Sequence, residues 1–164
     1  MKYLLDTCVI SELSKAKPNS QVVQWIKSQY EADFCLSVLT IGEIQKGITK
    51  LADSKKKLVL QKWLDQDLKT RFENRILEVS GIVAQKWGII QGESERQGKK
   101  MSVIDSFIAV TGLVYDITVV TRNIDDMVQS GLPCLIHGID IFVKKTNLLV
   151  KKKQLKSFIL FPQS

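Results

Sequence analysis

A short apolar run near the N-terminus, ended abruptly by an acid, constrains the fold more than any other stretch of the sequence. Residues Tyr3–Leu5 are followed by Asp6, Thr7 and Cys8, where a helical pattern begins. A strand this apolar suits the middle of a parallel sheet that is covered on both faces. Open α/β sheets bind ligands at the carboxyl edge of their strands. Asp6 is therefore predicted to lie at a ligand-binding edge, and the residues that join it there decide the function.

Strand-like and helix-like segments alternate along the rest of the chain. Four more strands are predicted, at residues 34–36, 76–79, 117–121 and 134–136. Helical spacing of apolar residues predicts helices within 9–13, 20–28, 41–51, 55–75, 82–90, 102–114 and 124–129. This alternation predicts a mostly parallel sheet with helices on both faces and right-handed crossovers.

The positive charge of the chain is concentrated at its C-terminus. The net charge is +7, and six lysines without any acid lie between Val143 and Ser164, so only +1 remains for residues 1–142. The N-terminal part therefore lacks an overall basic surface. Any affinity for phosphate there must come from local lysines, arginines or bound cations.

Length and composition indicate one cytoplasmic domain without a membrane segment. The 164 residues are enough for a single hydrophobic core. No uncharged apolar run approaches the ~20 residues of a membrane helix, and Asp6 comes too early for a signal peptide. The three cysteines form no C-x-x-C pair, and we expect reduced thiols at Cys8, Cys35 and Cys134.

Four acids stand out because of their positions in this pattern. Asp6 ends the first strand, Glu43 lies early in the helix after the second strand, and Asp126 follows the fourth strand. Asp105 interrupts a helix that is otherwise almost wholly apolar, so its carboxylate needs a partner or a cation. Helices that follow parallel strands start at the same edge of the sheet. We therefore expect Glu43 and Asp126 to lie at the edge where Asp6 ends its strand.

Helix capping is an alternative explanation for three of these acids. Thr40-x-x-Glu43 and Ser102-x-x-Asp105 both fit the capping-box pattern, in which the acid bonds back to the capping residue. Asp125 and Asp126 follow Asn123, a candidate cap, and their charges favour the positive end of the helix dipole. Capping accounts for each acid singly, but it does not explain the set.

Carboxylates that gather at one edge repel one another unless a cation neutralises them. Mg²⁺ and Mn²⁺ prefer such oxygen ligands, and they support hydrolysis of phosphodiesters. The residues that other catalytic mechanisms require are missing from the sequence. The only histidine, His137, lies beyond the last predicted strand, and no phosphate-binding loop or dinucleotide motif is present. Cys8 is interpreted as a packing residue rather than a nucleophile.

Four motifs follow one another in the expected order. They span residues Leu4–Leu13 (LLDTCVISEL), Leu39–Ile48, Gly98–Ala109 and Val120–Asp126. Together they resemble the PIN-domain family, and within it the VapC-type toxins of bacterial toxin–antitoxin pairs. The resemblance implies a three-layer α/β/α sandwich with a mostly parallel five-stranded sheet. It places a PIN-like nuclease domain at 1–136 and leaves 137–164 as a basic C-terminal extension.

The resemblance also implies an activity, a site and partners. It implies a toxin that is an endoribonuclease dependent on Mg²⁺ or Mn²⁺. The implied catalytic and metal-binding acids are Asp6, Glu43, Asp105 and Asp126, and the supporting residues, which would orient the fourth acid or the attacking water, are Thr121 and Asn123. By the family's spacing the fourth acid is Asp126, with Asp125 as its exposed neighbour. The implied partners are an RNA substrate, a second copy of the chain, and a small antitoxin that occludes the site and alone contacts operator DNA.

The sequence departs from the family's pattern at several positions. Cys8 stands where an asparagine is common, and we expect it to hold the first motif less firmly. Met127 replaces a common aromatic residue. Arg122 is interpreted either as a contact to substrate phosphate or as a solvent-exposed side chain. The extension after residue 136 has three open interpretations: an added amphipathic helix, an RNA-binding arm, or a disordered tail.

Two other functions compete with the nuclease. One is a non-cleaving PIN-fold module that acts on DNA in a regulatory complex with its antitoxin. The other is a phosphatase with Asp6 as nucleophile, but such enzymes usually carry a second acid two residues later, where this chain has Cys8. The full set of four acids favours the nuclease over both.

Overall fold

Five parallel strands form one sheet in the computed structural model, which describes residues 1–99 and 102–122, and the backbone of 136–138. The strands are β1 (Tyr3–Leu5), β2 (Phe34–Ser37), β3 (Ile76–Leu77), β4 (Thr118–Thr121) and β5 (Ile136–Gly138). Their order is β3-β2-β1-β4-β5, and every neighbouring pair is parallel. The apolar N-terminal strand is central, as predicted, and the parallel five-stranded sheet is confirmed.

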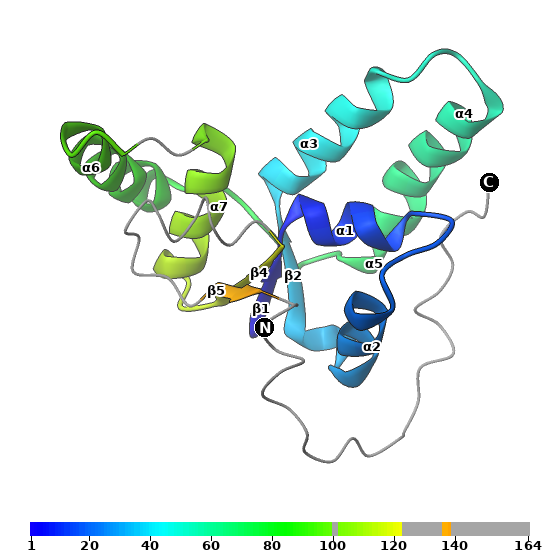
Figure 1. The fold of residues 1–164 in the computed structure, drawn as a ribbon, viewed down its shortest axis with the longest axis horizontal. Helices are drawn as coiled ribbons and strands as arrows, with labels where there is room; N and C mark the ends of the chain where they lie inside the picture. The colour runs from blue at the N-terminus through cyan, green and yellow to red at the C-terminus, as the bar shows by residue number, and fades with distance from the viewer. Residues whose placement is uncertain (100–101, 123–135, 139–164) are drawn as a thin grey trace.

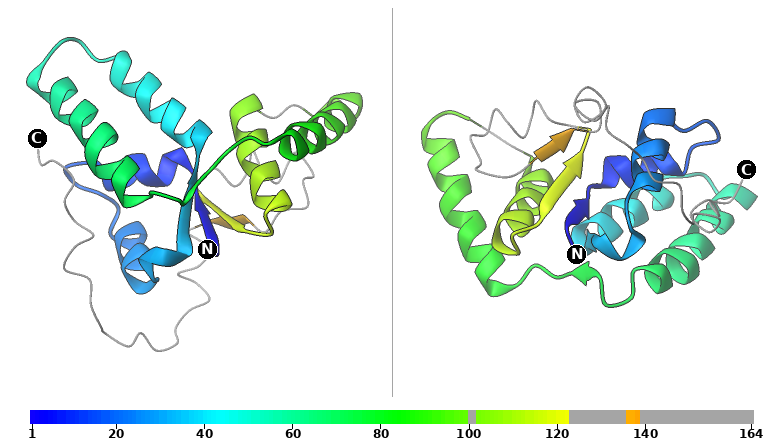
Figure 2. Two further views of the ribbon diagram at one scale, coloured as in Figure 1. Left: turned by 180° about the vertical axis from the view of Figure 1, so that it is seen from behind. Right: turned by 90° about the horizontal axis from the view of Figure 1, so that it is seen from below.

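Helices connect the strands and cover the two faces of the sheet (Figures 1 and 2). They are α1 (Thr7–Leu13), α2 (Ser20–Ser28), α3 (Val38–Thr49), α4 (Lys55–Lys62), α5 (Lys69–Arg71), α6 (Gly81–Arg96) and α7 (Val103–Val114). Helices α3 and α4 form a hairpin that projects from the sheet, and α6 packs mainly against α7 (Figure 1). No helix within the described part of the chain is long and apolar enough to cross a membrane.

Alternate residues of the central strands face opposite helical layers, which is the period of a strand buried on both sides. The larger core lies between the sheet and helices α1, α2 and α3. Its strand residues include Leu5, Leu36 and Val120. The smaller core lies between the sheet and α7. Its strand residues include Leu4, Cys35 and Val119. Two apolar cores on the two faces of one sheet confirm the α/β/α sandwich.

The segment predicted as one long helix over 55–75 is interrupted in its middle. A π-helical turn, Trp63–Leu68, separates α4 from α5. A π turn fits an extra residue into the helix and changes which side chains face inward. Here it brings into the larger core Trp63, Leu64 and Leu68.

The last strand lies later in the chain than predicted. It spans Ile136–Gly138, whereas the expected strand covered 134–136, of which 134 and 135 lie outside the described residues. His137 therefore belongs to the edge strand and pairs with Val120, rather than lying beyond the sheet. The division of the chain after residue 136 and the nature of the extension stay predictions.

Candidate active site

Asp6 lies where the central strand meets the first helix. It follows β1 directly and is the N-cap of α1, accepting a hydrogen bond from the backbone N–H of Thr7 at 2.6 Å. Its own backbone N–H donates to the carbonyl of Val120 in β4 at 3.0 Å. The side chain is buried, with 3% of its surface exposed. Backbone pairing and capping together thus fix this carboxylate at the carboxyl edge of the sheet.

Two further neutral groups donate to the second carboxylate oxygen of Asp6. The hydroxyl of Thr121, at the end of β4, donates to Oδ2 at 2.6 Å. The thiol of Cys8 donates to the same oxygen at 3.1 Å. Thr121 was expected to orient the fourth acid or a water, and the structure shows it holding Asp6.

Cys8 does more than the sequence predicts. Besides donating to Asp6, its sulfur accepts the backbone N–H of Arg122 at 3.2 Å, so it links the start of α1 to the end of β4. Burial, followed by the charge of Asp6, raises the pKa of Cys8 to about 11. The protonated thiol can therefore act as a donor. Cys8 thus bonds to Asp6 and to Arg122 through its sulfur, while the expectation that it holds the first motif less firmly than asparagine stays a prediction.

Thr7 joins the first acid to the second. Its hydroxyl donates to Oε2 of Glu43 at 2.5 Å, while its backbone N–H donates to Asp6 at 2.6 Å. One residue thus bonds to two carboxylates that are 37 positions apart in the chain. The structure confirms that Asp6 and Glu43 lie at the same edge of the sheet.

The capping explanation of Glu43 is wrong. The residue that caps α3 is Ser37, whose side chain accepts the backbone N–H of Leu39 at 3.2 Å. Glu43 therefore lies past the capping turn, and its hydrogen bond goes to Thr7. Capping by Ser102 at the start of α7 is as predicted, since its hydroxyl accepts the N–H of Asp105 at 3.4 Å.

The remaining acids are not gathered with this pair by the described structure. Asp105 is half-buried in the first turn of α7. Asp126, its neighbour Asp125 and the supporting Asn123 lie outside the described residues. Over 1–99 and 102–122, no group of three histidine, cysteine or acidic side chains is placed to hold an ion. The roles of Asp105, Asp126 and Asn123 stay predictions.

The surroundings of Asp6 fit a divalent cation. Among the described residues, its hydrogen-bond donors are a backbone amide, a hydroxyl and a thiol, all of them neutral. No lysine or arginine in the described ranges pairs with it. A buried carboxylate normally requires a paired charge or a metal ion. The oxygen-only pair of Asp6 and Glu43 suits Mg²⁺ or Mn²⁺.

A buried ion-pair network beside this site was not predicted. Glu12, only 5% exposed, accepts from Arg122 Nη1 at 2.6 Å and from Lys15 Nζ at 2.6 Å. The backbone N–H of Asn19 donates to its other oxygen at 2.9 Å. The bond from Lys15 is the main reason why the pKa of Glu12 is lowered, and the Asn19 amide and the two cations add to it.

Arg122 is thus solvent-exposed, which agrees with one of its two interpretations, but it is paired with Glu12. Its side chain ties the end of β4 to α1 through Glu12, while its backbone bonds to Cys8. The sequence held one sign of this network: Glu12 lies three residues after Val9, on the side of the first helix that is buried. A buried acid there requires a cation, and the sequence does not say which one.

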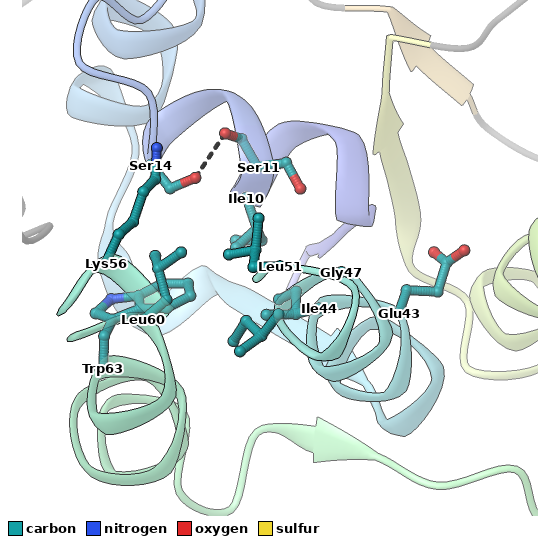
Figure 3. Close-up of a pocket in the computed structure, with 11 residues that line it drawn as sticks. Ile10, Ser11, Ser14, Glu43, Ile44, Gly47, Leu51, Lys56, Leu60 and Trp63 are labelled. Atoms are coloured by element: carbon teal, nitrogen blue, oxygen red, sulfur yellow. Dashed lines mark hydrogen bonds between the residues drawn. The ribbon is translucent and has the colours of Figure 1, made fainter. Parts of the chain in front are cut away.

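A pocket opens beside Glu43 between α1, α3 and α4 (Figure 3). Its volume is about 220 Å³, and most of its wall is apolar. Figure 3 shows Glu43 at one end, with Lys56 and Trp63 at the other. The apolar part of the wall is made by Ile10, Ile44, Ile48, Leu51, Leu60 and Trp63.

Known proteins are similar to this chain in sequence and in fold. The family described as the PIN domain matches residues 3–128. Toxin FitB of Neisseria gonorrhoeae is 38% identical over 120 residues, which cover 73% of this chain and 86% of FitB. VapC ribonuclease Y4jK of Sinorhizobium fredii is 28% identical over 129 residues, covering 79% of this chain and 92% of Y4jK. The structure of FitAB bound to the IR36 DNA fragment has a TM-score of 0.75 at 32% identity, over 82% of this chain and 93% of that chain.

The Glu12 network predicts a pH-dependent stability. Because Glu12→Gln removes a buried charge that accepts three hydrogen bonds, it should destabilise the protein by about 1–2 kcal/mol at pH 7, given that both cations are partly exposed. A lowered pKa contributes stability above the ordinary value of 4.5, and this contribution is lost as the pH falls through the lowered value. The difference from wild type in urea denaturation should therefore shrink at acidic pH.

The exposed Glu73 provides a matched control. Glu73→Gln should leave the free energy of unfolding within about 0.5 kcal/mol of wild type at both pH values. Equal stability of Glu12→Gln and wild type at pH 7, or a difference that grows on acidification, would contradict the assigned network.

Proposed function

The chain belongs to the PIN-domain family, and from this premise we propose that it is a toxin that cleaves RNA with a divalent metal ion. Its relatives include a protein named as a toxin and one named as a VapC ribonuclease. The single observation that carries the proposal is the Asp6 carboxylate, which is buried, forms no ion pair within residues 1–99 and 102–122, and is tied through Thr7 to Glu43.

Asp6 and Glu43 would hold the ion, with Asp105 and Asp126 as further ligands. When bound, Mg²⁺ or Mn²⁺ neutralises phosphate oxygens and lowers the pKa of a water at the site. The ordinary preference of Mg²⁺ for carboxylate and water oxygens supports this assignment, as does the all-neutral shell around Asp6. No described histidine or lysine is needed as a general base.

The chain's own residues orient the acids. Thr121 and Cys8 both bond to Oδ2 of Asp6 and restrict rotation of the carboxylate. Thr7 bonds to Oδ1 through its backbone and to Glu43 through its hydroxyl, so a shift of either acid disturbs the other. Such partners of metal-binding carboxylates normally set affinity for the ion. Asn123 is proposed to orient the fourth acid or the attacking water.

An antitoxin is the proposed regulatory partner, and operator DNA is bound through it. The relative FitAB was solved on a DNA fragment, which supports a complex of this type. The apolar pocket beside Glu43 offers a binding place for an antitoxin segment, which would cover the candidate site. We also propose a homodimer, supported by apolar side chains exposed on α6 and at the start of α7, namely Ile82, Ile89 and Val103.

The second candidate function is a non-cleaving module that acts on DNA only with its antitoxin. The DNA-bound structure of the related complex is the observation that favours it. The two candidates share fold and partner, and they differ in whether the isolated protein cleaves RNA. Cleavage of total cellular RNA by the purified protein therefore distinguishes them.

Replacing Asp6 by asparagine should abolish cleavage. Asp6→Asn keeps the size of the side chain but removes the charge, and we expect a loss of at least about 100-fold in the cleavage rate, as when one charge-stabilising group is removed. The assay compares cut-end maps of total RNA for wild type and Asp6→Asn, with Mg²⁺ and with a chelator. Asp67→Asn, at an exposed position of the π-helical turn, is the control and should cleave normally. Metal-dependent cleavage retained by Asp6→Asn would refute the assignment.

Filling the pocket should separate inhibition from cleavage. A Cβ at Gly47 would meet no atom within 4 Å, so Gly47→Leu can be accommodated and its side chain would occupy the pocket. We expect the concentration of antitoxin needed to inhibit RNA cleavage to rise by about 10-fold or more, since a buried anchor loses its place. The uninhibited cleavage rate should stay close to wild type.

The matched control for the pocket variant is Gly88→Leu on α6, where an added Cβ also meets nothing within 4 Å. It should be inhibited like wild type. If Gly47→Leu were also inhibited at the wild-type antitoxin concentration, the antitoxin would not use this pocket.

A further inference from the structure

The α3–α4 hairpin is a locally basic part of the chain. Residues 38–62 contain six lysines and two acids, a net charge of +4, whereas residues 1–142 together carry only +1. The hairpin projects from the sheet on the side that bears α1 (Figures 1 and 2). A local basic surface therefore exists despite the nearly neutral total.

Two of these lysines continue a row that starts at Glu43. Lys46 and Lys50 follow Glu43 by three and seven residues, and since Lys50 is the C-cap of α3 with helical backbone angles, all three lie along one side of this helix. At 1.5 Å per residue, the two lysines lie about 4.5 and 10.5 Å further along the helix axis. Both are exposed, and the hydrogen bond of Glu43 goes to Thr7 rather than to Lys46.

A third lysine borders the same region from the other helix. Lys56, in the first turns of α4, lines the pocket to which Glu43 also belongs, at the opposite end (Figure 3). The row touches this pocket at Glu43, its first member, and Gly47, which follows Lys46 in the chain, also lines the pocket. We call Lys46, Lys50 and Lys56 the lysine track.

Three other cations of this region are neutralised by acidic partners. Lys57 pairs with Asp53 at 2.9 Å, and Arg122 and Lys15 both pair with Glu12. By contrast, no acid within the described ranges forms an ion pair with any lysine of the track. Within the described residues, the track is therefore uncompensated positive charge that starts beside Glu43.

We propose that the lysine track binds the sugar-phosphate backbone of the RNA that the candidate site cleaves. The inference rests on the proposed function, because it assigns that site its substrate path. Lysines act as point charges for phosphate and read no base sequence. The row begins at Glu43, where the scissile phosphate would have to lie, and this favours RNA over an acidic antitoxin segment as its occupant.

The test measures RNA binding separately from cleavage. In the full-length Asp6→Asn protein with Mg²⁺, the affinity for a fluorescein-labelled single-stranded RNA of mixed sequence is measured over a salt series. The triple variant Lys46→Gln, Lys50→Gln, Lys56→Gln should weaken binding about 10-fold or more at low salt. The slope of log affinity against log salt should fall by about 2, since each phosphate contact on a single strand contributes ~0.7.

A matched triple removes three exposed cations elsewhere. Lys17→Gln, Lys86→Gln and Arg96→Gln cause the same change in net charge, and this variant should keep the parent slope. An unchanged slope in the track variant, or an equal loss in the control, overturns the inference. So does a track variant that binds RNA like its parent but binds the antitoxin more weakly, because the lysines would then serve the antitoxin.

These outcomes are independent of the proposed activity. If wild type fails to cleave RNA while the track variant loses RNA affinity, the proposed function fails and the binding surface stands. If wild type cleaves and the track variant binds normally, the nuclease stands and the track fails.

Discussion

A buried carboxylate whose donors in the described part of the chain are all neutral is the constraint on which the rest of this structure depends. Asp6 can occupy its place because β1 is central, because β4 pairs beside it, and because α1 starts at once. The same junction brings the Thr121 hydroxyl and the Cys8 thiol onto one carboxylate oxygen. Thr7 then extends the arrangement to Glu43 on α3. The sheet edge, the first helix and the hairpin are thus coupled at one charge that pairs with no lysine or arginine in the ranges the structure describes.

The sequence predicted the parts of this arrangement that follow from chain-local patterns. The apolar run before Asp6 and the alternation of strands and helices were enough for the parallel sheet and the shared edge. They were not enough for tertiary contacts: Glu43 fits a capping pattern, and only the fold shows Ser37 as the cap and Thr7 as the partner of Glu43. The Glu12–Arg122 pair joins positions 110 residues apart, which no local pattern reveals.

Charge distribution shows why net charge alone misleads. Nearly all of the net positive charge lies after Val143. The α3–α4 hairpin is nevertheless strongly basic, and its charge is hidden in the total because acids elsewhere in residues 1–142 offset it. Glu12 removes Arg122 and Lys15 from the cations available to a ligand. What is left beside the candidate site is the lysine track. Ion pairing within the fold, rather than composition, therefore decides which cations can meet a phosphate.

Thr7 joins Asp6 to Glu43, the two acids that we propose to hold one cation. The most direct test is a Mn²⁺ titration of the full-length protein, with free Mn²⁺ followed by electron paramagnetic resonance. Thr7→Ser keeps the hydroxyl and should bind Mn²⁺ like wild type. Thr7→Val keeps the shape but removes the bond to Glu43, and it should bind about 10-fold or more weakly, the usual effect of losing a group that orients a metal ligand. Equal Mn²⁺ affinity of Thr7→Val and wild type would contradict the claim.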